Sequence, residues 1–337
     1  MVRRTIPFLL TILVACSAGA APGIVHLRRG DQVSGNLVRL NREGVRIRTR
    51  AGVRDFPAAD IESVTFQVTD IDGSRVTRQV SFQEEGAFLP FTLETPNFVI
   101  KTDIGPHVCR NAGQAMEQLY REFQQIFGVP DGAQRKKTEL LIFEKEDDFR
   151  AYAEELGANL PERALGFYRR SSDGRSQIVA YKRRTEEHHT LSTLYHEATH
   201  HFLGLALRQR PPLWLDEGLA VYFETSRWQN GRLVTGVKPR IRLMQLQHAI
   251  RQDRHHPLDK LMTFGRAEYD SLAYAQGWSL VYFLMNYAGQ ERFARYMRKL
   301  REGEDPEEAF KTSFTRDIDR LEEAWKQYVL QLQVPDG

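Results

Sequence analysis

The chain has 337 residues, of which 41% are hydrophobic, 27% are charged and 10% are aromatic. This composition is typical of a soluble globular protein of two or three domains, and it excludes collagen, a long coiled coil and wholesale disorder. The formal net charge of +3 falls to +1 without Arg3 and Arg4, so the overall charge gives no reason to expect a nucleic-acid partner.

Residues 1–20 have the pattern of a secretory signal peptide. Two arginines precede an apolar run at residues 5–15, which is too short to cross a membrane, and small residues follow. Two alternatives are open for its processing. Ala18-Gly19-Ala20 fits cleavage by signal peptidase, whereas residues 13–16 resemble a bacterial lipobox in which Cys16 carries a lipid anchor. In both cases we expect an exported protein of the periplasm or cell envelope, without a transmembrane span.

Residues 22–82 predict a small antiparallel β-barrel, similar to SH3-like and Sm-like barrels. Apolar residues alternate with arginine, and turn signals divide the segment into short strands. Asp72-Gly73 predicts a hairpin, and residues 83–90 are expected to be a linker. The barrel is locally basic because of Arg28, Arg29, Arg39, Arg42, Arg46, Arg48, Arg50 and Arg54. These arginines are either solvated strand faces or contacts for an anionic envelope polymer or nucleic acid.

From residue 91 strands alternate with helices, so we predict an α+β fold for the chain. Residues 91–210 are expected to form a mixed sheet with helices, and residues 211–337 a helical subdomain. The expected strands and helices before residue 211 are 98–101, 109–127, 140–143, 147–156, 166–168, 177–181 and a helix from about 185. Cys109 is expected to be a small buried residue rather than a reactive thiol.

The helix that begins near residue 185 carries the motif His196-Glu-Ala-Thr-His200. Two histidines at i and i+4 project from one helix face, so both imidazoles can reach one metal ion. Glu197 can reach a water on that metal without being a ligand. His201 points to a different face. Four other histidines lie in polar surroundings and are expected to be solvated rather than ligands: His188, His189, His255 and His256.

A catalytic zinc site needs a third protein ligand and keeps one position open for water. The candidate is Glu217, in a segment that follows the chain break at Pro211-Pro212. Residues 213–225 have helical spacing. A carboxylate near the start of this second helix can therefore face the two histidines.

The two motifs together, HExxH at 196–200 and Trp214-Leu-Asp-Glu-Gly-Leu-Ala220, resemble the gluzincin metallopeptidases, the thermolysin and aminopeptidase N group of the peptidase MA clan. Within that group the chain resembles bacterial exported families whose catalytic domain begins with a strand such as Thr95-Pro-Asn-Phe-Val-Ile100. The resemblance covers about residues 91–290. It implies a thermolysin-like zincin domain, with a small mixed sheet over the HExxH helix and a helical second half.

The resemblance also implies roles for individual residues. One Zn²⁺ per chain is held by His196, His200 and Glu217, and Glu197 acts as the general base. Tyr274-Ala-Gln-Gly277 is similar to the Y-x-K-G segment of aminopeptidase N-type enzymes, with Gln276 where lysine is usual. This similarity implies that Tyr274 stabilises the oxyanion.

Two departures from those enzymes bear on the site. The G-x-M-E-N segment that anchors a free amine in aminopeptidases is absent. Val221 stands where thermolysin has an acidic residue after its third ligand. Asp216 and Glu224 are therefore the candidates for carboxylates that support the metal ligands from outside.

From these features we expect an exported zinc metallopeptidase that cleaves peptide or protein substrates through a Glu-activated, zinc-bound water. The substrate is expected to pair with an exposed edge strand just before the motif helix. That strand consists of Gln177, Ile178, Val179, Ala180 and Tyr181. The alternative is a non-catalytic cell-envelope binding protein that has a structural zinc site and works through its barrel.

Overall fold

The computed structural model describes residues 21–69, 75–82, 89–130, 132–134, 136–182, 187–229 and 232–335. The chain divides into two compact units that interleave in sequence. The first comprises Met1–Gln114, Lys137–Leu165 and Arg170–Glu187, and the second Ala115–Lys136, Gly166–Arg169 and His188–Gly337. The proposed signal segment with Cys16, the Asp72-Gly73 turn and most of the linker lie outside the described residues.

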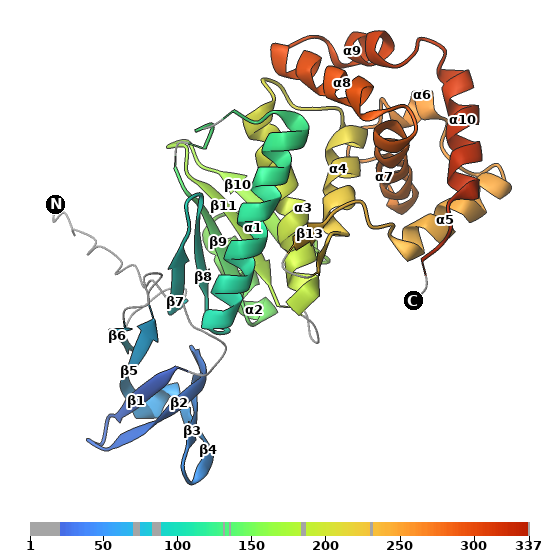
Figure 1. The fold of residues 1–337 in the computed structure, drawn as a ribbon. Helices are drawn as coiled ribbons and strands as arrows, with labels where there is room; N and C mark the ends of the chain where they lie inside the picture. Colours follow the sequence, from blue (N-terminus) through green and yellow to red (C-terminus); the bar gives the residue numbers. More distant parts are fainter. Residues whose placement is uncertain are drawn as a thin grey trace. The chain divides into compact units, whose positions relative to one another are not determined.

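The N-terminal segment forms a six-stranded antiparallel sheet in the order β4-β3-β2-β1-β5-β6 (Figure 1). The strands are β1 (Pro22–Leu27), β2 (Gln32–Asn41), β3 (Gly44–Thr49), β4 (Gly52–Pro57), β5 (Ile61–Thr69) and β6 (Arg75–Ser81), with a 3₁₀ turn at Ala58–Asp60. Alternate residues such as Val25, Ile47 and Phe66 are buried, as the apolar–polar pattern predicts. In the described residues β4 and β6 form the two edges, so the sheet is not closed, which is compatible with the small antiparallel barrel that was expected.

A second, mixed sheet of five strands has the order β10-β11-β9-β8-β7. Its strands are β7 (Phe91–Glu94), β8 (Phe98–Thr102), β9 (Thr138–Phe143), β10 (Gly166–Arg170) and β11 (Ser176–Tyr181). β7 runs antiparallel to β8, whereas β8, β9 and β11 are parallel. The expected mixed sheet is thereby confirmed.

The prediction that Gln177–Tyr181 is an edge strand is wrong. These residues belong to β11, which lies between β10 and β9 and pairs with β9 from Gln177↔Glu139 to Tyr181↔Phe143. Ile178, Val179 and Ala180 are fully buried. The hairpin turn that follows β10 places β10 on the outside, so β10 and β7 are the edges of this sheet.

The rest of the chain is helical apart from a two-stranded ribbon, as expected for its C-terminal half (Figure 1). The helices are α1 (Pro106–Phe127), α2 (Glu146–Glu155), α3 (Glu187–Ala206), α4 (Leu213–Glu224), α5 (Arg240–Arg251), α6 (Leu258–Leu261), α7 (Ser271–Asn286), α8 (Gln290–Glu302), α9 (Pro306–Ser313) and α10 (Ile318–Gln331), and the ribbon is β12 (Arg227–Gln229) with β13 (Arg232–Val234). Aspartate side chains cap the start of α7, α9 and α10. None of the helices in the described ranges is both long and apolar enough to cross a membrane.

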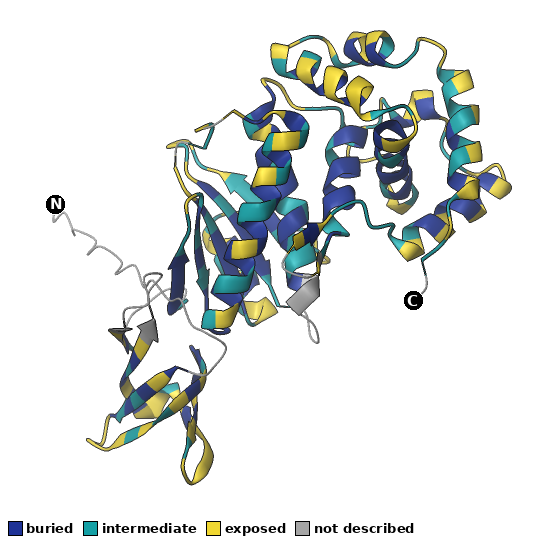
Figure 2. Ribbon diagram, viewed as in Figure 1, coloured by how far each residue is buried: buried dark blue, intermediate teal, exposed yellow. Residues whose placement is uncertain are grey.

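An aromatic cluster forms the core of the second unit. The Phe123 ring of α1 lies 4.8 Å from Phe127, 5.1 Å from Phe202 of α3 and 4.6 Å from Phe223 of α4, measured between ring centroids. Figure 2 shows that α4 and α7 are buried along almost their whole length. The aromatic cluster therefore holds α3, which carries the HExxH motif, and α4, which carries Glu217, against the same packed interior.

Two single-residue expectations have different outcomes. Cys109 is a free, fully buried cysteine, as expected, and burial raises the pKa of its thiol. His255 is not solvated, because its side chain is only 5% exposed and its Nε2 lies 2.9 Å from Glu322. The same carboxylate accepts a hydrogen bond from the backbone N–H of Leu258, so this histidine helps to hold α6 to α10.

Candidate metal centre

The helix α3 presents His196 and His200 on one side and its apolar residues on the other. Leu194, Ala198 and Phe202 are fully buried, whereas both imidazoles are partly exposed. The two rings come from successive turns of the helix, and their centroids are 5.0 Å apart. The i,i+4 spacing of the motif therefore places both rings at one point on the helix surface, as the sequence predicts.

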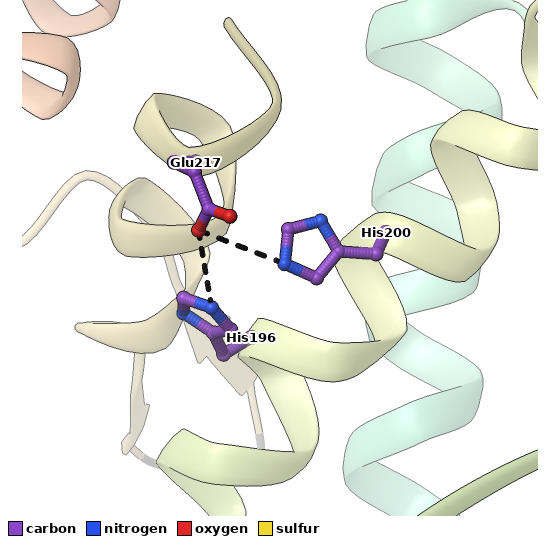
Figure 3. A group of neighbouring side chains, drawn as sticks. All are labelled: His196, His200 and Glu217. Atoms are coloured by element: carbon purple, nitrogen blue, oxygen red, sulfur yellow. Dashed lines mark ion pairs between the residues drawn. The ribbon is translucent and has the colours of Figure 1, made fainter. Parts of the chain in front are cut away.

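Glu217 approaches these rings from α4. Pro212 caps this helix in an extended conformation, and its carbonyl accepts the N–H of Asp216, so the first turn begins directly after the proline pair. Glu217 is only 1% exposed. Its Oε2 lies 3.5 Å from His196 Nε2 and 3.8 Å from His200 Nε2, as Figure 3 shows.

The opposite nitrogen of each imidazole is held by a carboxylate. His196 Nδ1 lies 3.2 Å from Glu224 Oε2, and His200 Nδ1 lies 2.7 Å from Asp216 Oδ1. A carboxylate only accepts hydrogen bonds, so each Nδ1 donates its proton to a carboxylate, and each Nε2 is the nitrogen left for a metal ion. This carboxylate–histidine arrangement orients imidazole ligands in metal sites.

The group fits a divalent metal ion. The ligand atoms of His196, His200 and Glu217 all lie within 4.8 Å of one another. Glu217 Oε2 is buried and has no hydrogen-bond partner, although its other oxygen accepts a hydrogen bond from Arg266 Nη1 at 2.9 Å. A buried anionic oxygen without a partner is costly. Two imidazole nitrogens and a carboxylate oxygen are a donor set of catalytic zinc sites, and a cation between them removes that cost.

The electrostatics of the group favour a positive charge at this point. Burial alone would raise the pKa of Glu217, but the neighbouring imidazoles of His196 and His200 lower it to about 2. Burial likewise opposes protonation of His196, and the carboxylates of Glu217 and Glu224 raise its pKa to about 10. The carboxylate is thus ionised, and in the absence of a metal a proton supplies the charge that a cation would bring.

Glu197 and Tyr274 interact electrostatically with the ligand group without belonging to it. Among the described residues, the metal-binding group contains only the two histidines and Glu217. Glu197 is half-buried, and its charge raises the pKa of both His196 and Tyr274. Burial, followed by the charge of Glu217, also raises the pKa of Tyr274, so its phenol keeps its proton and remains a hydrogen-bond donor.

The helices α4 and α7 cross through two glycines beside the site. A Cβ on Gly218 would lie 2.5 Å from the carbonyl oxygen of Gly277 and 2.9 Å from Val281. Only glycine allows this approach, and Gly218 directly follows Glu217. Gln276, next to Gly277, is fully buried and forms two hydrogen bonds of 2.8 Å with the backbone of His256. Gln276, which stands where aminopeptidases have lysine, thus links α7 to the backbone of His256.

The other predicted positions have different outcomes. The β11 residues 177–181 belong to the first unit, and the side chains of His188 and His189 are outside the described part of the chain. His201 is 2% exposed, and its Nδ1 lies 3.2 Å from the hydroxyl of Tyr168. Sequence reasoning missed Arg266, which contacts Glu217 from a loop 49 residues later. No local pattern marks such a contact.

Comparison with known proteins agrees with this geometry. A family model described as the Peptidase MA superfamily matches residues 188–331, a segment that includes α3, α4 and α7. No curated protein matches the chain. The resemblance of the HExxH and WLxEGLA motifs to this superfamily is thereby confirmed, and with the His-His-Glu group it points to a metallopeptidase.

We expect Gly218→Ala to weaken metal binding through the helix crossing. The added methyl group must push α4 away from α7, which costs about 1–3 kcal/mol of stability and displaces Glu217. Zinc affinity, measured by competition with a chromophoric chelator, should fall by about tenfold or more, the scale on which disturbed ligand support acts.

Gly204→Ala is the matched control. Gly204 lies in α3 with open space around its missing Cβ. Alanine there should stabilise the helix by about 0.5–1 kcal/mol and leave zinc affinity unchanged. Equal zinc affinities for the two variants would contradict the role assigned to the glycine contact.

Proposed function

We propose, from the match of residues 188–331 to the Peptidase MA superfamily, that the chain is an exported zinc-dependent metallopeptidase that hydrolyses peptide bonds. One observation carries the proposal. The buried Oε2 of Glu217 has no hydrogen-bond partner and faces the Nε2 atoms of two histidines whose Nδ1 atoms are held by carboxylates. The residues that hold the zinc are then His196, His200 and Glu217.

The chain itself supplies the acid–base chemistry. Zinc, when bound, polarises the carbonyl of the scissile bond and lowers the pKa of the attacking water. Glu197 accepts a proton from that water as its oxygen bonds to the carbonyl carbon. Glu197 then gives this proton to the amide nitrogen as the C–N bond breaks, so that the amine leaves neutral. A carboxylate adjacent to a ligand, but outside the ligand group, is suited to this transfer.

Tyr274 is the proposed donor to the developing oxyanion. Its phenol is protonated at neutral pH because burial and nearby carboxylates raise its pKa. A fixed donor at this position stabilises the transition state, and removing one such donor typically costs about 10²–10³ in kcat. Asp216 and Glu224 act through the histidines, because their hydrogen bonds fix the direction of both Nε2 lone pairs.

A second proposal concerns the N-terminal sheet, which we infer binds an anionic envelope polymer. A surface groove of about 1060 Å³ crosses β1, β2, β3, β5 and β6. It is lined by Pro22, Gly23, Ile24, Ser34, Gly35, Asn36, Arg48, Thr49, Arg50, Ala51, Thr65, Phe66, Gln67 and Thr77, without a carboxylate. Arg48 and Arg50 are exposed and make no ion pair within the described sheet. Hydroxyl, amide and guanidinium groups suit an acidic polysaccharide, and the buried Phe66 offers no stacking face for nucleic-acid bases.

Export follows from the signal-like residues 1–20, which lie outside the described part. Processing after Ala20 and lipidation of Cys16 are both compatible with the proposal. The alternative function is a non-catalytic envelope binding protein in which the same zinc site only stabilises the fold. Both functions require zinc, so turnover separates them.

Replacing Glu197 by Gln tests the peptidase mechanism. The amide is nearly isosteric and is not a ligand, so zinc content and thermal stability should stay close to wild type. Gln does not accept the proton of the water, so cleavage of a denatured-protein library should fall by about 10² or more. Zinc analysis and peptide mapping by mass spectrometry measure the two properties.

Two further variants frame the result. Glu217→Gln should lose zinc itself, because an anionic ligand becomes neutral. Glu302→Gln, an exposed residue at the end of α8, should behave as wild type. Library cleavage by Glu197→Gln at the wild-type rate, or no cleavage by zinc-loaded wild type, would contradict the mechanism, and the second result would favour the binding protein.

The groove is tested by the double variant Arg48→Gln/Arg50→Gln. This variant should bind polygalacturonate more weakly than wild type, because two charge contacts are lost. Binding is measured as retention on the immobilised polymer at increasing salt concentration. Arg292→Gln/Arg295→Gln removes the same charge from exposed positions on α8 and should keep binding. Equal retention of both double variants would mean that the arginines of the sheet are only solvated.

A further inference from the structure

The segment that leads into α5 carries an unbalanced positive charge. Lys238, Arg240 and Arg242 lie within five residues, and the first turn of α5 has no acidic residue. Cations at a helix N-terminus oppose the helix dipole, so this arrangement does not stabilise α5. In the described ranges none of these three residues forms an ion pair. The first ion pair after them along the chain joins Asp253 to His255. The charge of this run is therefore not neutralised by an ion pair in the described part of the chain.

Arg242 is the member of this run that faces the site. Its guanidinium carbon lies 5.5 Å from the ring centroid of Tyr274, the proposed oxyanion donor. Its charge also acts on two neighbours: it helps His196 to lower the pKa of Glu224, and it opposes the rise that burial causes in the pKa of Tyr269. Arg242 is half-buried, so part of the residue is open to solvent.

Arg266, the other guanidinium at the site, is already engaged. Its Nη1 donates to Glu217 Oε1 at 2.9 Å, which fixes this oxygen and leaves Oε2 for the metal. The neighbouring carboxylates are engaged too, because Glu224 and Asp216 bind the two histidines. Among the described residues, Arg242 is thus the cation near the ligand group whose side chain forms no hydrogen bond or ion pair, so its donors are available to a bound molecule.

We propose that Arg242 binds a carboxylate of the substrate, so that the site selects peptides with a negative charge near the scissile bond. This inference rests on the proposed peptidase function. A guanidinium presents paired N–H donors that match the two oxygens of a carboxylate, and the face of Tyr274 holds the guanidinium in place. The four site carboxylates, Glu197, Asp216, Glu217 and Glu224, would otherwise repel such a substrate.

Two parts of a peptide offer this chemistry. The carboxylate belongs either to an aspartate or glutamate side chain, which means cleavage within a chain, or to the C-terminus, which means removal of residues from the end. Both place the same anion against Arg242. The experiment below separates them.

The test uses the zinc-loaded full chain and a peptide sequence that it cleaves, found by mapping its cuts in a denatured-protein library. That peptide is made with Glu or Gln beside the cut, and each form has a free or an amidated C-terminus. For wild type, kcat/KM should be about tenfold or more higher for the form with the recognised carboxylate, the effect of one hydrogen bond to a charged group. The difference should lie mainly in KM, because the contact exists before the chemistry.

Arg242→Gln should bring this ratio close to one, whereas Arg240→Gln, an exposed arginine in the same turn, should keep the wild-type ratio. Comparison of the free and the amidated C-terminus shows which carboxylate of the peptide Arg242 recognises. Zinc content and melting temperature of Arg242→Gln are measured in parallel, so that a misfolded variant is recognised. Arg242→Lys then replaces it. Lysine keeps the charge but loses the paired donors, so this variant should show a reduced ratio.

Two results would overturn the inference and leave the peptidase intact: no selectivity in an active wild type, or an unchanged ratio in Arg242→Gln. An unchanged ratio with an equal loss of rate on all peptides would mean that Arg242 acts through Tyr274 rather than on the substrate. No cleavage of any peptide by zinc-loaded wild type would overturn the proposed function together with the inference.

Discussion

The arrangement of the ligand group depends on a single buried carboxylate oxygen. Glu217 Oε2 is enclosed by protein, lacks a hydrogen-bond donor and faces two imidazole nitrogens. Water is largely excluded there, so a cation between Oε2 and the two imidazoles would remove the cost of leaving this oxygen without a partner. The surrounding contacts then have one purpose: Asp216 and Glu224 turn the lone pairs of the histidines inward, and Arg266 occupies the second oxygen of Glu217.

This arrangement depends on packing well outside the ligand group. The aromatic cluster around Phe123 joins α1, α3 and α4, and the contact of Gly218 with Gly277 joins α4 to α7. The ligands, the proposed oxyanion donor and the free arginine therefore come from four helices of one unit, α3, α4, α7 and α5. In the proposed mechanism, chemistry and substrate selection belong to different helices, so variants of α5 are expected to alter selection without disturbing the ligands.

Much of the site could be predicted because helix geometry is local. The spacing of His196 and His200 fixes their common face, and the proline pair before α4 fixes where the Glu217 helix begins. The α+β class and the helical second half follow from periodicity in the same way. What failed were properties set by distant partners. The periodicity of Gln177–Tyr181 indicates a buried strand, but only pairing with β10 decides that it is not an edge.

Other contacts lie equally beyond sequence reasoning. The polar neighbours of His255 suggested solvation, yet Glu322, 67 residues later, covers it. Arg266 reaches Glu217 and Arg242 reaches Tyr274 across the tertiary fold, and neither arginine belongs to a motif. The alternation of residues predicts the antiparallel strands of the N-terminal sheet, but it does not say whether the sheet closes, because closure depends on pairing between the edge strands.

The metal content of the purified chain tests the central claim most directly. Metal analysis of wild type should find close to one zinc per molecule, and an anomalous difference map at the zinc edge should place it between His196 Nε2, His200 Nε2 and Glu217 Oε2. His200→Ala should lose the zinc, and His248→Ala, which removes an exposed histidine from α5, should keep it. A wild-type chain that stays metal-free in excess zinc, or a zinc ion bound elsewhere, would contradict the account.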